Sequence, residues 1–123
     1  MQSNESQEMY LETILVLGKE KEHVRSVDVA NDLGFKKSSV SVGMKHLREK
    51  KYIEVDEKGY ITLTPAGKEI AEMIYERHQF LSEYLMKIGV PEDIAIDDAC
   101  KIEHVISKES FEALKKRVKN LKK

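Results

Sequence analysis

The sequence has only one cysteine among its 123 residues, and it lacks any long apolar run. A single cysteine cannot form an intramolecular disulfide, which is typical of a reducing compartment. The first eight residues are polar and lack the apolar centre of a signal peptide. No stretch approaches the roughly 20 apolar residues that a membrane helix needs. These absences argue against a secreted or membrane-spanning protein and predict a cytoplasmic one.

An excess of charge of one sign is also absent, since 21 Lys and Arg against 22 Asp and Glu leave a net charge of −1. The chain as a whole therefore shows no basic signal for nucleic acid. Its charge is unevenly distributed, however. Residues 36–51 hold six basic side chains and one acidic one, whereas residues 65–106 hold four basic and nine acidic ones. A segment of +5 before a segment of −5 indicates an anion-binding part followed by a cation-binding part.

The N-terminal half has the pattern of a helix-turn-helix. Apolar spacing from Tyr10 to Leu17 predicts a first helix over residues 6–21. Ser26 is expected to cap a second helix over residues 27–33, and Gly34 suits its C-terminal end. A third helix is predicted from about Lys37 to residue 50. Two short helices joined by a tight turn are typical of DNA-binding proteins, and the second would be the recognition helix.

The predicted DNA contacts are lysines and small hydroxyl side chains around the recognition helix, which suit phosphates and base edges. They are Ser26, Lys36, Lys37, Ser38, Ser39, Ser41 and Lys45, with Lys58 from the segment that follows. The alternative interpretation is an ordinary capped and solvated helix.

Two alternating, β-branched stretches at residues 52–55 and 60–64 predict strands joined by a turn at residues 56–59. Thr64 and Pro65 then suit the start of a long helix that runs to about residue 88. The order of helix, helix-turn-helix, hairpin and long helix predicts a mainly α fold with a small β-hairpin wing. We expect a winged helix-turn-helix domain over residues 1–64 and a helical dimerisation and metal-binding domain over residues 65–123.

The strongest candidate for chemistry is a group of three possible metal ligands near the C-terminus. Cys100, Glu103 and His104 stand at i, i+3 and i+4, on a helix predicted over residues 91–106, so all three share one face. A thiolate, a carboxylate and an imidazole together make half of a transition-metal site. The alternative is a lone buried cysteine beside a surface Glu–His pair. Ser107 is expected to cap a last helix with a single apolar stripe.

Taken in order, these features resemble the diphtheria toxin repressor (DtxR/MntR) family of metal-dependent transcriptional regulators. The resemblance covers about residues 5–121. It is carried by Met-Tyr-Leu at residues 9–11, Arg-His at 77–78 and Cys-x-x-Glu-His at 100–104, together with residues 38–41 and 63–67. It implies a homodimer that binds palindromic operator DNA when loaded with Fe²⁺ or Mn²⁺, with one or two ions per subunit. It also implies the short form, without an SH3-like domain.

The resemblance supplies a ligand set drawn from two branches of the family. Positions matching the iron-responsive branch are Met9, Cys100, Glu103 and His104, and positions matching the manganese-responsive branch include Glu12 and His78. In the manganese branch, carboxylates stand where this chain has Met9 and Cys100. Val42 replaces a polar residue of the recognition helix, so the resemblance does not give the operator sequence.

Chemistry favours iron over manganese, because the thioether of Met9 and the thiolate of Cys100 are soft ligands whereas Mn²⁺ prefers oxygen. Without the resemblance, Met9 suits the core, Glu12 suits solvent and His78 suits a polar surface. One alternative function is a winged-helix regulator without a metal, which would sense oxidation of Cys100. Another is a metalloenzyme, which we disfavour because no general base or oxyanion-stabilising group is evident.

Overall fold

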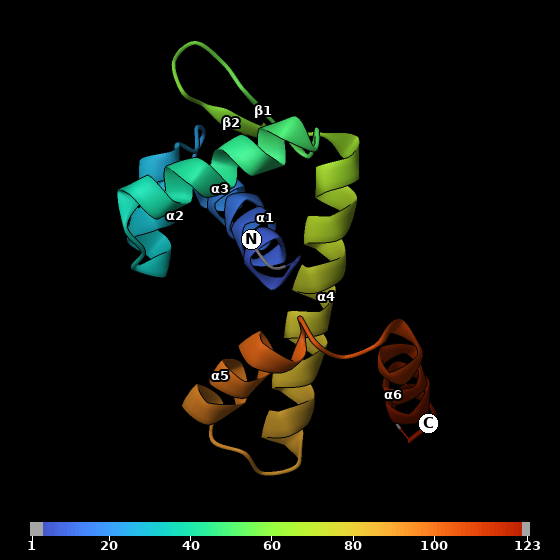
Figure 1. Ribbon diagram of the computed structural model, residues 1–123. Helices are drawn as coiled ribbons and strands as arrows, with labels where there is room; N and C mark the ends of the chain where they lie inside the picture. The colour runs from blue at the N-terminus through green and yellow to red at the C-terminus, as the bar shows by residue number, and fades with distance from the viewer. Residues whose placement is uncertain (1–3, 122–123) are drawn as a thin grey trace. The chain divides into compact units, whose positions relative to one another are not determined.

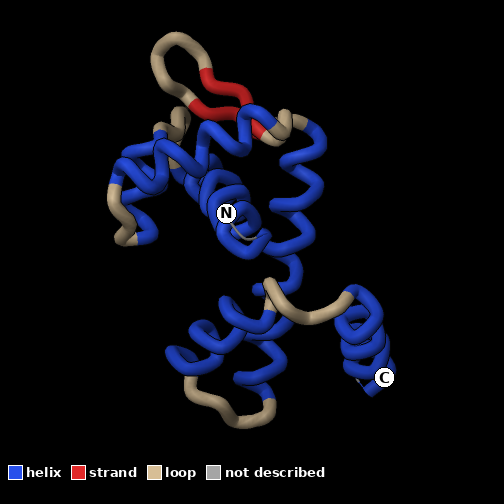
Figure 2. Tube along the Cα trace, in the orientation of Figure 1, coloured by secondary structure: helices blue, strands red, loops and turns tan. Residues whose placement is uncertain are grey.

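The computed structural model describes residues 4–121, within which six helices and one two-stranded hairpin follow one another (Figure 1). They are α1 (Asn4–Glu20), α2 (Ser26–Leu33), α3 (Lys37–Glu49), β1 (Ile53–Val55), β2 (Ile61–Leu63), α4 (Pro65–Lys87), α5 (Glu92–Ile102) and α6 (Lys108–Leu121). Figure 2 shows helix everywhere except in the hairpin and the connecting turns. The mainly α fold with a hairpin wing is therefore confirmed. None of these helices is long and apolar enough to span a membrane.

The chain forms two compact units, Met1–Met73 and Ile74–Lys123, which divide within α4. In the first unit, one apolar core joins α1, the helix-turn-helix and the wing. Its fully buried members include Leu11, Val29, Val40 and Leu47. Helices α1 and α3 approach closely because Gly43 has no side chain. A Cβ atom at that position would lie 2.4 Å from the ring of Tyr10.

The hairpin is short and antiparallel, with Ile53 opposite Leu63 and Val55 opposite Ile61. Asp56 shapes the turn, because its carboxylate accepts the backbone N–H groups of Lys58 and Tyr60, both at 2.9 Å. The predicted strands extended one or two residues further than these. The core side of the hairpin also holds a bridge between Val24 and Ile61, which ties the wing to the segment before α2.

Helix α2 starts differently from the expectation. Arg25, and not Ser26, is the N-cap residue, and the carboxylate of Asp28 accepts the Arg25 backbone N–H at 2.9 Å. Asp28 thus supplies the half of a capping box in which the side chain at N3 accepts the N–H of the N-cap residue. Gly34 does occupy the C-terminal position with φ +70°, as expected.

In the second unit, the C-terminal half of α4 packs with α5 and α6 through apolar side chains. The ring of Phe80 meets that of Phe111 edge to face at 5.5 Å. Ser107 caps α6 as predicted, since its Oγ accepts the N–H of Ser110 at 3.0 Å. Helix α5 starts directly after its N-cap residue Pro91 but ends at Ile102, so the helix predicted over residues 91–106 is too long at its C-terminal end. Glu103 keeps helical backbone angles, whereas His104 lies in the turn that follows.

Candidate metal centre and nucleic-acid interface

A buried carboxylate is the centre of the second unit's polar cluster. Glu103 is only 1% exposed. Its Oε2 lies 3.1 Å from Nδ1 of His78, and its Oε1 lies 3.3 Å from Nε2 of His104. Two imidazoles from different elements, the middle of α4 and the turn after α5, therefore face one carboxylate.

Cys100 completes a group with three different donor atoms. It lies in the last turn of α5, and its Sγ is 3.7 Å from Nδ1 of His78. The ligand atoms of His78, Cys100 and Glu103 all lie within 4.8 Å of one another. Cys100 is exposed, so the alternative of a buried, purely structural cysteine is wrong.

Without a metal, a protonated His78 forms an ion pair with the Glu103 carboxylate. Hydrogen bonding to Cys100, and then to Glu103, raises the pKa of His78 to about 10. Burial alone would raise the pKa of Glu103, but the close imidazoles of His104 and His78 outweigh that effect and lower it. The metal-free centre therefore pairs an imidazolium with a carboxylate.

The donor set fits a divalent transition ion. Oε2 of Glu103 is buried and has no well-aligned hydrogen-bond donor, although Nδ1 of His78 is close enough for an ion pair. A buried carboxylate oxygen of this kind is costly unless a cation compensates it. Thiolate, imidazole and carboxylate are all ligands for Fe²⁺, Co²⁺, Ni²⁺ and Zn²⁺.

Arg77 holds the turn that contains Glu103 and His104, a role that the sequence analysis missed. Its guanidinium donates to the backbone oxygens of Glu103 and Ile106, at 3.1 and 3.0 Å. It is only 8% exposed and lies over the ring of Phe111. The sequence held a signal for this, because residues 74, 77 and 81 stand at i, i+3 and i+7 and place Arg77 in the apolar stripe of α4.

The remaining predicted ligands, Met9 and Glu12, lie on α1 in the first unit, where both are half-buried. The second unit brings together His78, Cys100, Glu103 and His104. That Met9 and Glu12 bind the same metal stays a prediction.

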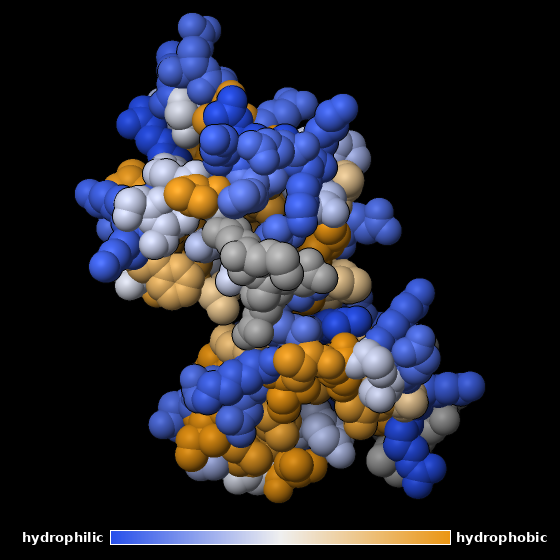
Figure 3. Space-filling view, in the orientation of Figure 1, coloured by the Kyte–Doolittle hydropathy of each residue, from blue (hydrophilic) through white to orange (hydrophobic). Residues whose placement is uncertain are grey.

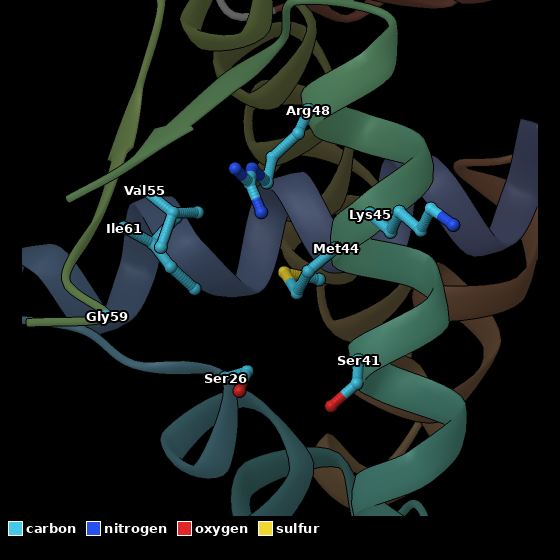
Figure 4. Close-up of a pocket in the computed structure, with 8 residues that line it drawn as sticks. All are labelled: Ser26, Ser41, Met44, Lys45, Arg48, Val55, Gly59 and Ile61. Carbon is cyan, nitrogen blue, oxygen red and sulfur yellow. The ribbon is translucent and has the colours of Figure 1, made fainter. Parts of the chain in front are cut away.

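The predicted DNA contacts lie around α3 in the first unit. All of them are exposed except Ser26, which is half-buried at the start of α2. Ser26, Ser41 and Lys45 line one pocket between α3 and the wing, together with Arg48, which the sequence analysis did not select (Figure 4). Lys58 lies in the turn of the hairpin, next to Gly59, and is not one of the residues that line that pocket.

Two protein-family models match successive parts of this chain. Residues 3–61 match the family model "Iron dependent repressor, N-terminal DNA binding domain". Residues 64–123 match "Iron dependent repressor, metal binding and dimerisation domain".

The chain is similar to the HTH-type transcriptional regulator MntR of Bacillus pumilus, with 35% identity over 109 residues, which are 89% of this chain and 76% of that protein. MntR of Geobacillus thermodenitrificans is 35% identical over 102 residues, covering 83% of this chain and 72% of that protein. Among solved structures, IdeR of T. acidophilum has a TM-score of 0.79 and 28% identity, over 90% of this chain and 53% of that chain. This chain thus spans about half the length of that IdeR. From these matches, the chain belongs to the diphtheria toxin repressor family of metal-dependent transcriptional regulators.

Proposed function

We propose that this protein is a homodimeric repressor that binds palindromic operator DNA when it holds Fe²⁺ or Mn²⁺, and that it controls genes of metal homeostasis in the cytoplasm. The observation that carries the proposal is the buried Glu103 carboxylate between two imidazoles and beside an exposed thiol. That cluster lies inside the segment that matches the family's metal-binding domain. The exposed lysines and serines of α3 lie inside the segment that matches its DNA-binding domain.

The proposed ligands are Met9, Glu12, His78, Cys100, Glu103 and His104, which serve one or two ions per subunit. His78, Cys100, Glu103 and His104 are supported by their mutual distances, and Met9 and Glu12 by the family resemblance. A thioether and a thiolate in one set favour Fe²⁺ over Mn²⁺. The oxygens of Glu12 and Glu103 keep Mn²⁺ competent.

The proposed dimer would form through the second unit. Four large apolar side chains there, Met86, Ile88, Ile94 and Ile96, are 37–62% exposed. Figure 3 shows apolar side chains gathered on this part of the surface. Such a patch is typical of a protein–protein interface.

We also propose that the domains divide at residues 1–64 and 65–123, with DNA binding in the first part and dimerisation and metal binding in the second.

Metal control follows if the ion binds one arrangement of the dimer better than others. A dimeric helix-turn-helix protein binds well only when its recognition helices match half-sites about 34 Å apart. A ligand that favours this spacing shifts the population toward the DNA-binding form.

The test is DNA binding by the full chain under anaerobic conditions, with operators selected from a random-sequence pool in Fe²⁺ or Mn²⁺. We expect tight binding in either ion and its loss in chelator. Glu103→Gln should remain a folded dimer and lose metal activation, because the amide cannot replace the anionic ligand. The matched control is Glu109→Gln, an exposed side chain on α6, which should behave as the wild type. Equal affinity with metal and with chelator would refute the proposal.

A second candidate is supported by the exposure of Cys100 beside His78. A thiol sensor would lose or gain DNA binding on treatment with peroxide, in chelator, and Glu103→Gln would leave this response intact. The same binding assay therefore separates the two functions.

A further inference from the structure

We propose that the pocket between α3 and the wing holds a phosphate of the DNA backbone, and that Arg48 anchors it. This inference rests on the proposed function and adds a contact that the sequence analysis did not identify. The pocket has a volume of about 180 Å³. It lies wholly within the first unit.

The lining of this pocket combines positive charge, hydroxyl groups and an apolar floor. Figure 4 shows Arg48 and Met44 projecting from α3 toward the wing, with Ser41 further along the same helix and Ser26 across the gap. Within residues 4–121, the side chains of Arg48, Ser26 and Ser41 make no hydrogen bond or ion pair. A cation and two hydroxyls that face one cavity without protein partners are suited to an anion.

The spacing along α3 places the cationic and hydroxyl groups together. Ser41 and Arg48 stand at i and i+7 and so lie on one side of the helix, whereas Figure 4 shows the Lys45 side chain running away from the gap. Arg48 can donate two parallel N–H groups to a phosphate, whereas Lys45 acts as a point charge. Met44, Val55 and Ile61 supply the apolar part of the lining, which lowers the local dielectric constant beside Arg48 and so strengthens its attraction for an anion.

The geometry of duplex DNA then indicates that this anion is a phosphate of the DNA backbone. If α3 lies in the major groove and the wing reaches the adjacent minor groove, the sugar–phosphate backbone that separates the two grooves must pass between α3 and the wing. The pocket is the hollow on the protein surface at that place. Each strand carries a phosphate every 3.4 Å or so of the helix axis, so one of them can lie beside Arg48 without any base contact.

The experiment compares Arg48→Gln with the wild type on an operator selected from random DNA, in saturating Mn²⁺ or Fe²⁺. Each phosphate contact contributes about 0.9 to the slope of log affinity against log salt concentration. For each subunit, we expect Arg48→Gln to reduce that slope by about one and to weaken binding roughly tenfold, as expected for the loss of one charged hydrogen bond. Arg48→Lys should recover the slope and only part of the affinity. The matched control is Arg117→Gln, an exposed arginine on α6, which should change neither quantity.

A second arm locates the contact. Operators carrying a neutral methylphosphonate at one backbone position are tested in turn. The wild type should lose affinity at one position in each half-site, and Arg48→Gln should lose nothing further there. A third arm replaces chloride by inorganic phosphate at constant ionic strength, which should leave both proteins unchanged.

The possible failures are distinguishable. If the wild type does not bind DNA in a metal-dependent way, the proposed function fails. If it does, but Arg48→Gln matches Arg117→Gln or no methylphosphonate position depends on Arg48, the phosphate pocket alone is refuted. If inorganic phosphate competes with DNA in the wild type and not in Arg48→Gln, and no methylphosphonate position depends on Arg48, the pocket is a site for a free anion and the DNA assignment is wrong.

Discussion

Arg77 illustrates how one buried residue can hold a functional segment without being a ligand. Arg77→Met keeps the apolar stem but leaves the backbone oxygens of Glu103 and Ile106 without their donor. We expect the free energy of unfolding to fall by about 1–3 kcal/mol, the usual penalty for buried groups that lose a partner. Metal affinity should fall as well, because the segment that carries Glu103 and His104 loses its anchor. Urea denaturation in chelator and calorimetric Mn²⁺ titration measure the two effects.

The control for this substitution is Arg117→Met on the exposed face of α6. It should leave both quantities unchanged. If Arg77→Met binds metal with normal affinity, Arg77 serves stability alone.

His78 gives the metal-free protein a characteristic pH dependence. Its pKa is about 10 in the folded state, against an ordinary 6.5. The folded state therefore binds the proton more tightly, and this stabilisation is complete below pH 6.5 and is lost as the pH rises toward 10. We expect metal-free stability to decrease over that window more steeply in the wild type than in His78→Gln. Denaturation in chelator at pH 6, 8 and 10 tests this, and parallel curves for the two proteins would contradict it.

At the scale of the elements, the sequence predicted the order and kind of every helix and strand among residues 4–121, because each has a clear apolar period. The wrong predictions concern the ends of elements, because each end depends on a side chain that is distant in the sequence or of an unexpected type. Asp28 caps α2 through the N–H of Arg25, although serine is the commoner cap. The turn after α5 is held by Arg77, 26 residues before Glu103, which no local pattern reveals. Arg48 was missed for a similar reason, since its pocket needs the wing opposite.

The start of α4 depends on a close approach that only glycine permits. A Cβ on Gly67 would lie 2.0 Å from the backbone oxygen of Tyr52, so the helix or the residue that precedes β1 must shift. We expect Gly67→Ala to destabilise the protein by about 1–3 kcal/mol, as overpacking does. Gly18, in the last turns of α1, has nothing within 4 Å of its added Cβ. There, alanine should stabilise by roughly 0.5–1 kcal/mol. Thermal or urea unfolding compares the two variants, and equal effects would contradict the steric argument.

At the scale of the whole molecule, opposite charges belong to different tasks. The +5 segment of residues 36–51 forms the surface proposed to meet DNA, and the acidic residues after it include Glu103 of the proposed metal centre. Because the charges of the two segments cancel, the net charge of −1 reveals neither of them. Sequence analysis could identify the donors His78, Cys100, Glu103 and His104, but only the folded chain shows that Glu103 is the buried member around which the others gather.

Metal choice tests the whole arrangement, because it requires ligands, dimer and DNA surface together. Met9 and Cys100 offer sulfur where the manganese branch of the family offers oxygen, so Fe²⁺ should activate DNA binding at lower concentration than Mn²⁺. In Met9→Asp with Cys100→Glu, both positions become carboxylates, and the preference should move toward Mn²⁺ without loss of activation. The double variant also lacks the one thiol and should tolerate air better. Anaerobic titration of DNA binding with each ion gives the Fe²⁺-to-Mn²⁺ ratio in both proteins. An unchanged ratio would mean that ligand softness does not select the metal, and that the oxygen and nitrogen ligands Glu12, His78, Glu103 and His104 set the choice.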